Sequence, residues 1–211
     1  MIADGQLAQP LDIVTVVVPV AVYFFILGLL NSRRRPQLLS GRCDFAILAI
    51  ALSPLGVLPM VKTLGGAAWT IPLAVAMPAV LIALLSPGRA TWVIYNVSRP
   101  AARKAVARTV KRLGLPYRQA AEGLYLPGAD ATVRLGGLTV LRNVSVRLSG
   151  GDRQLARRFS EALGTELAGV RVEPTPTGVT LLLVATGMLA APLTLVARDA
   201  PQVVRLLTDL F

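Results

Sequence analysis

The sequence predicts an α-helical membrane protein with four transmembrane helices, both termini outside, and a cytoplasmic α/β domain inserted between the third and fourth helices. Composition supports this fold class. Of the 211 residues, 54% are hydrophobic and only 16% are charged, and the mean hydropathy of +0.63 is far from the average of soluble proteins. The net charge of +11 is nevertheless large, and it is carried by other segments than the apolar ones. The chain therefore combines an apolar part with a water-exposed basic part.

Four apolar segments contain no Asp, Glu, Lys or Arg. A helix rises 1.5 Å per residue, so about 20 such residues cross a hydrocarbon core of about 30 Å. We predict transmembrane helices at 13–31, 45–61, 67–85 and 178–197, the first three within residues 13–86. The second segment is at the short end of the range, and a buried core helix is the alternative for it.

The basic residues decide the orientation. Nineteen of the 22 lie in two places, the loop after the first helix and the segment from Arg89 to Arg171. Cytoplasmic loops carry an excess of Lys and Arg, and both places are cytoplasmic only if the N-terminus is outside. We therefore assign 87–177 to the cytoplasmic domain, and 1–12 and 198–211 to the outside. The last of these has an apolar stripe and is expected to lie on the outer membrane surface.

The residue composition indicates where the protein is located and which cofactors it can bind. Arg outnumbers Lys by nineteen to three, and Ala, Leu, Gly and Val dominate the rest, which we interpret as the composition of a GC-rich bacterial genome. A bacterial inner membrane is the expected location. The single cysteine excludes a disulfide within the chain, and the absence of histidine removes the commonest metal ligand. We expect no cofactor and no metal.

The α/β domain begins with a strand and a helix. Thr91 to Val97 is rich in β-branched and aromatic residues, which predicts a strand. Ser98 followed by Pro100 is typical of a helix N-terminus. Apolar residues then recur at helical spacing, at Ala102, Val106, Val110 and Leu113.

The order of the expected strands and helices in the domain predicts a ferredoxin-like α/β sandwich with an extra hairpin or a long bent third strand. After a weaker strand at 117–126, two strands at 132–135 and 138–148 flank Gly136-Gly137, a pair suited to a tight hairpin turn. Asp152 is placed to cap a second helix, in which Leu155, Phe159 and Leu163 share a face. A short strand at 170–173 is expected to complete the sheet.

Clusters of basic residues are the candidate binding sites. One follows the first helix, and the other decorates the helix after Ser98. At a cytoplasmic membrane surface such clusters bind anionic lipid headgroups at about 1 kcal/mol per residue, and they also suit an acidic partner. For the first cluster, a plain topology signal is the alternative, and for the second, a solvated face. The candidate residues are Arg33, Arg34, Arg35, Arg103, Lys104, Arg108, Lys111 and Arg112.

Several functions are disfavoured by what the sequence lacks. No phosphate-binding glycine loop, nucleotide-binding glycine motif, serine elbow or histidine metal motif occurs. The same ground disfavours nucleic-acid binding, since Tyr95, Tyr117 and Tyr125 are not part of any RNA-binding aromatic motif. An enzyme acting on lipids would have to use acidic residues such as Glu122, Asp130 and Asp152, which form no recognisable dyad.

Every predicted span contains proline, which occurs in the broken helices of transporters and equally in ordinary kinked helices. The spans have no ionisable residue, which disfavours an ion or proton pathway. We therefore expect a non-enzymatic integral membrane subunit or scaffold of a multi-protein complex, in contact with lipid and with other subunits or copies of itself. The alternative is a homo-oligomeric channel or transporter for a small solute.

Overall fold

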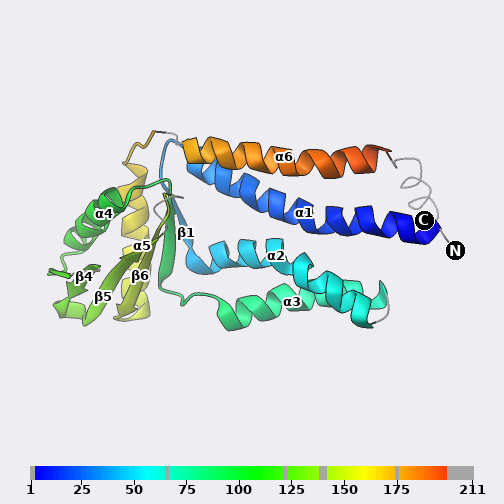
Figure 1. Ribbon diagram of the computed structural model, residues 1–211. Helices are drawn as coiled ribbons and strands as arrows, with labels where there is room; N and C mark the ends of the chain where they lie inside the picture. Colours follow the sequence, from blue (N-terminus) through cyan, green and yellow to red (C-terminus); the bar gives the residue numbers. More distant parts are fainter. Residues whose placement is uncertain (1–2, 65–66, 121–122, 138–141, 174–175, 199–211) are drawn as a thin grey trace.

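The protein is a mixed α/β protein in which a layer of long helices meets a sheet at one end (Figure 1). The computed structural model describes residues 3–64, 67–120, 123–137, 142–173 and 176–198. The described part contains six α-helices, two short 3₁₀ helices and one six-stranded antiparallel sheet.

Four α-helices form the helical layer, and each contains or overlaps one of the four apolar segments. In Figure 1, α6 runs beside α1, and α3 beside α2. Helix α1 begins ten residues earlier than predicted, because the residues that precede the apolar segment are largely Ala, Gln and Leu, which favour a helix. The bounds are α1 Ala3–Ser32, α2 Gly41–Leu64, the 3₁₀ turn η1 Ala67–Trp69, α3 Thr70–Leu85 and α6 Pro176–Arg198.

Two of these helices are long and apolar enough to cross a membrane, namely Asp12–Ser32 of α1 and Gly41–Leu64 of α2. The second span is therefore longer than its uncharged stretch of sequence. Helix α3 and the portion of α6 from Pro176 to Ala190 are shorter apolar helices. At the end of the layer remote from the sheet, Lys62 of α2 forms an ion pair with Asp12 of α1.

The sheet has the order β1-β2-β6-β5-β4-β3, and every neighbouring pair is antiparallel. Helices α4 and α5 cover one of its faces (Figure 1). The bounds are β1 Gln37–Ser40, β2 Thr91–Tyr95, α4 Arg99–Arg112, β3 Arg118–Ala120, β4 Gly123–Leu126, the 3₁₀ turn η2 Pro127–Ala129, β5 Ala131–Gly136, β6 Val144–Gly150 and α5 Arg153–Ala168.

Both helices of the domain begin as the sequence predicts. The Ser98 hydroxyl accepts a hydrogen bond from the Ala101 N–H, and the Asp152 carboxylate accepts one from the Leu155 N–H at 2.6 Å. Such caps satisfy N–H groups that have no partner within the helix. The predicted starts of both helices are confirmed.

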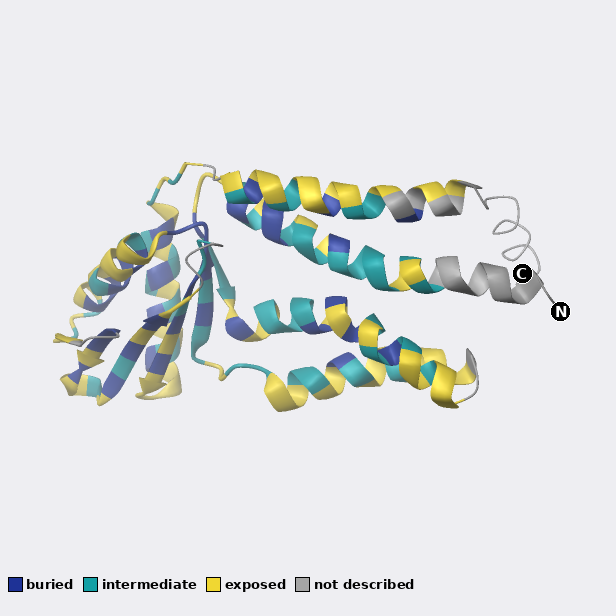
Figure 2. Ribbon diagram, in the orientation of Figure 1, coloured by how far each residue is buried: buried dark blue, intermediate teal, exposed yellow. Residues whose placement is uncertain are grey.

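The core lies between the sheet and these two helices (Figure 2). Alternate strand residues point into it, as in β2, where Ile94 is fully buried, and in β6, where Val146 is. Phe159 of α5 is also fully buried and packs against Trp92, with ring centroids 5.6 Å apart. A continuous cluster of apolar side chains therefore holds the domain together.

Three local predictions change. The predicted strand at 170–173 is wrong, since this segment is irregular, and the sheet edge beside β2 is occupied by β1, a strand that the sequence did not suggest. The strand at 117–126 is a hairpin of β3 and β4. Gly136 pairs with Ser145, so the turn after β5 is longer than two residues. The start of the predicted 138–148 strand and the tail at 199–211 lie outside the described residues.

Candidate functional site

The predicted arginine triplet lies where α1 ends and the sheet begins. Its side chains are exposed, but its backbone is fixed by the domain, because the Asn96 side-chain amide donates to the Arg33 carbonyl at 2.6 Å. The Val172 N–H likewise donates to the Arg34 carbonyl at 3.0 Å. The backbone of the triplet is therefore hydrogen-bonded to the domain, while its side chains form a basic surface.

A pocket of about 660 Å³ opens beside this joint. It is lined by Arg34, Arg35, Arg171, Val172 and Glu173, so its lining contains three arginines and one acidic residue. Arg171 lies more than 130 residues from Arg34 in the sequence, and only the return of the chain from α5 towards α6 brings them together. Sequence analysis missed this residue because no local pattern distinguishes it from the other arginines.

A second contact joins the sheet to the helical layer. The Tyr95 hydroxyl at the end of β2 donates to the carboxylate of Asp44 in the first turn of α2. Tyr95 is 2% exposed, and burial, followed by this hydrogen bond and the charge of Asp44, raises the pKa of its phenol well above the usual range. The adjacent Asn96 is fully buried with a φ of 57°, a left-handed conformation that Asn tolerates better than most residues.

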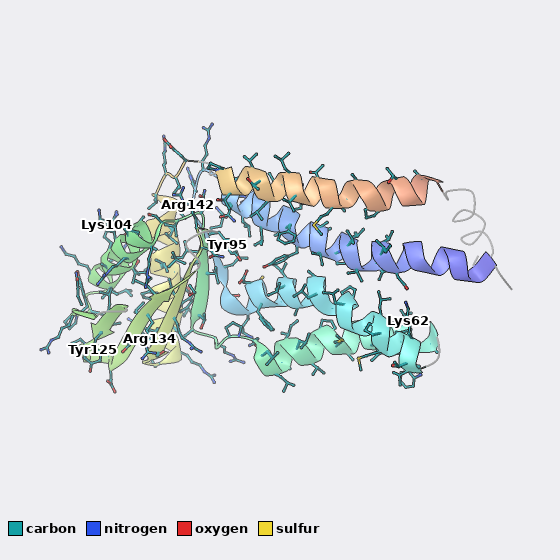
Figure 3. The ribbon with its side chains drawn as sticks, viewed as in Figure 1. Lys62, Tyr95, Lys104, Tyr125, Arg134 and Arg142 are labelled. Carbon is teal, nitrogen blue, oxygen red and sulfur yellow. The ribbon has the colours of Figure 1, made fainter. Side chains whose placement is uncertain are left out.

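The second predicted cluster lies elsewhere, on α4. Its five basic side chains are exposed, because the buried residues of α4, such as Val106 and Val110, occupy the opposite face. Figure 3 shows Lys104 on the side of the domain that points away from the helical layer. The structure therefore separates the eight predicted residues into a group where the helical layer meets the sheet and a group on a remote helix face. The remote face, named here the α4 basic face, comprises Arg103, Lys104, Arg108, Lys111 and Arg112.

Neutralisation of the α4 basic face is incomplete. Arg112 pairs with Glu166 of α5 at 3.3 Å, and Arg103 donates to the Gln119 side chain at 3.5 Å. Lys104, Arg108 and Lys111 form no ion pair or side-chain hydrogen bond with any residue that the structure describes. These three cations are spaced four and three residues apart on one helix, where like charges destabilise the helix by a few tenths of a kcal/mol per pair. An anionic partner would relieve that repulsion.

The uncovered face of the sheet carries a further basic group that sequence analysis did not single out. Arg134 of β5 lies directly opposite Arg147 of β6, and both are exposed. Tyr125 of β4 is exposed on the same face and donates a hydrogen bond to Asp130 at 3.4 Å. Alternation along each strand predicts that these side chains point outward, but the pairing of the two arginines requires the register.

The acidic residues considered for catalysis are dispersed. Asp152 caps α5 and Asp130 accepts from Tyr125, and Glu122 is outside the described residues. Within the described segments, no group of three or more Cys, Asp or Glu side chains is placed to hold a metal ion. The sites that the structure offers are therefore basic surfaces and arginine-lined pockets.

Comparison with known proteins does not identify the chain. No protein-family model matches the sequence, and no significant match was found among curated proteins or among solved structures. The function is therefore argued from the geometry.

Proposed function

We propose that this protein is a non-enzymatic integral membrane subunit of a bacterial inner membrane, held by four transmembrane helices, whose cytoplasmic domain docks an acidic partner protein. The observation that carries the proposal is the placement of the α4 basic face on the far side of a domain whose other end is joined to apolar helices.

Exposure of the long helices supports the membrane part. Only 17% of the apolar window in α1 and 22% of that in α2 is buried within the protein. A core helix of a soluble protein of such apolarity would be mostly buried, because exposed apolar surface costs about 25 cal/mol per Å² in water. Lipid acyl chains remove that cost.

The arrangement of the layer supports four crossings. Helix α6 lies along α1, and α3 along α2, so that all four helices occupy one slab (Figure 1). If α1 and α2 cross a membrane, their neighbours lie at the same depth. Lys62 and Asp12 then pair at the outer surface, while the arginine triplet reaches the cytoplasmic surface, as the excess of cytoplasmic positive charge requires.

An acidic protein fits the α4 basic face better than the membrane does. The face points away from the helical layer, and attraction to lipid charge falls off within about 8 Å at physiological salt. The arginine triplet is the part of the predicted site that reaches lipid headgroups. The eight residues thus divide between two partners, with lipid at the joint and protein on α4.

The test is co-purification from native membranes in a mild detergent or polymer disc, with mass measurement and identification of bound proteins. Charge reversal by Lys104→Glu, Arg108→Glu and Lys111→Glu is expected to abolish recovery of a stoichiometric acidic subunit. The matched control, Arg118→Glu, Arg134→Glu and Arg158→Glu, makes the same change in charge on other exposed positions and should retain the subunit. Recovery of a pure homo-oligomer from the wild type would overturn the proposal and direct the next experiment to solute flux.

A further inference from the structure

A second arginine-lined pocket lies at the other end of the domain, between the end of α3 and the start of α5. It has a volume of about 420 Å³, within the range of small-molecule sites. Three arginines from two separate segments contribute to it, Arg89 from the connection before β2, and Arg153 and Arg157 from α5. Trp92 and Ser160 are also in its lining.

The pocket has unsatisfied positive charge. Arg89 and Arg153 make no ion pair or side-chain hydrogen bond within the described part of the chain. Arg157 donates from Nε to Glu161 at 2.9 Å, which leaves its terminal amino groups available. The one carboxylate in the lining, Asp152, is engaged in capping α5 through the Leu155 N–H. Three arginines thus line a pocket whose lining contains a single carboxylate, that of Asp152.

We infer that this pocket binds the phosphate group of an anionic phospholipid headgroup. Guanidinium groups bind phosphate oxygens through paired, charge-assisted hydrogen bonds, and several arginines around one concavity can share the oxygens of one phosphate group. This inference uses none of the residues of the α4 basic face, and it extends the lipid contact beyond the arginine triplet.

The depth of the pocket favours a lipid over a soluble phosphate. Arg89 follows Leu85, the last residue of α3, by four residues, so its Cα lies within about 14 Å of the helix end even if the chain is fully extended. The polar headgroup layer extends about 5–8 Å beyond the hydrocarbon core, and an arginine side chain spans much of the remainder. This step depends on the proposed membrane placement of α3.

The experiment measures binding of short-chain lipids to the full-length protein in a non-ionic detergent. Trp92 lines the pocket and reports on it by fluorescence once Trp69, which is exposed at the other end of the layer, is replaced by Trp69→Phe. The probes are dioctanoyl phosphatidylglycerol, dioctanoyl phosphatidylcholine and inorganic phosphate. We expect saturable binding of the phosphatidylglycerol, with at least about tenfold weaker binding of the other two.

Matched variants locate the binding. The double variant Arg89→Gln, Arg153→Gln should weaken phosphatidylglycerol binding by about tenfold or more. The control variant Arg34→Gln, Arg35→Gln removes the same charge from the other pocket, and the affinity measured by Trp92 fluorescence should stay within about twofold of the wild type. Arg153→Lys keeps the charge and should bind phosphatidylglycerol with intermediate affinity. For every variant, an unchanged Trp92 emission maximum in the absence of lipid indicates an intact fold.

Equal binding by the wild type and the Arg89→Gln, Arg153→Gln variant would overturn the inference, and so would binding of inorganic phosphate as tight as that of the lipid. Labelling of introduced cysteines from each side of the membrane tests the four-helix topology separately. A failed topology with intact lipid binding would refute the proposed function alone. A confirmed topology without lipid binding would refute only this site.

Discussion

The sheet domain and the helical layer differ in how far they bury their apolar side chains. In the domain, Ile94 and Phe159 are fully buried, and buried residues alternate with more exposed ones along β5 and β6. In the layer, Ile71 is 76% exposed and Leu84 is 77% exposed, and polar residues scarcely interrupt the sequence (Figure 2). The domain therefore has an apolar interior of its own, whereas the helical layer leaves much of its apolar surface exposed. The two halves are expected to respond differently to the same substitution.

The largest effect is expected from truncation in the domain core. Phe159→Ala removes a fully buried ring that packs against Trp92, and such changes cost about 3–5 kcal/mol of unfolding free energy. Leu84→Ala on α3 removes a side chain that touches little protein, so the unfolding free energy of the domain should change by less than about 0.5 kcal/mol. Urea unfolding in detergent, followed by near-ultraviolet circular dichroism, measures both variants. Similar losses for both variants would contradict the contrast between the halves.

The joint between the halves is tested next. Asn96→Ala removes the hydrogen bond to the Arg33 carbonyl and places a Cβ-only side chain at a φ of 57°, so we expect a loss of about 2–3 kcal/mol. Asn96→Gly relieves the backbone conformation and loses only the hydrogen bond, with an expected loss of about 1 kcal/mol. Denaturant midpoints distinguish the two, and an Ala variant as stable as the Gly variant would show that backbone conformation has no role there.

A smaller, pH-dependent effect is expected at Tyr95. Tyr95→Phe removes the hydrogen bond to Asp44, for a loss of about 1–2 kcal/mol at neutral pH. Because the pKa of Tyr95 is raised in the folded state, its contribution is fully present below about pH 10, the unfolded pKa, and declines as the pH rises above it. The wild type should therefore lose stability above pH 10 more steeply than the Phe variant. Tyrosinate absorbance at 295 nm measures the ionisation directly.

The smallest effect concerns the uncovered face of the sheet. Arg134→Glu replaces a like-charged cross-strand pair with an opposite-charged one beside Arg147, which should stabilise the domain by about 0.2–1 kcal/mol. The gain should shrink at high salt, because both side chains are exposed. A stability that is independent of salt would mean that the two side chains do not interact.

The elements that sequence predicted well are those whose signals are local. Helix α4 has its cap at Ser98, its early proline and its apolar spacing within fifteen residues, and α5 has its cap at Asp152 followed by its own apolar spacing. Strand β1 has none of this, since four residues in a loop do not show a period, and its pairing partner Thr91–Tyr95 lies about fifty residues away. The predicted strand at 170–173 was wrong for a related reason. Its sequence permits a strand, but β1 already occupies the edge beside β2.

The basic sites likewise fall into those that the sequence shows directly and those that only the fold brings together. The triplet and the α4 basic face are runs or helical repeats that the sequence displays directly. The two pockets each combine arginines from different segments, Arg34 with Arg171 and Arg89 with Arg153, and the Arg134–Arg147 pair depends on strand register. Charge composition predicts that a basic surface exists, but the convergence of particular guanidinium groups is a property of the fold.

Strand β1 also imposes an order on biosynthesis. Ser40 precedes Thr91 by fifty-one residues, so at about 5–20 residues per second the ribosome delivers the partner strand roughly 3–10 s after β1 has been made. During that interval the chain of helices α2 and α3 is made, while β1 has no partner along its hydrogen-bonding edge. A fragment that starts at β2 would never receive that strand, and its exposed edge would be free to pair with another copy and aggregate.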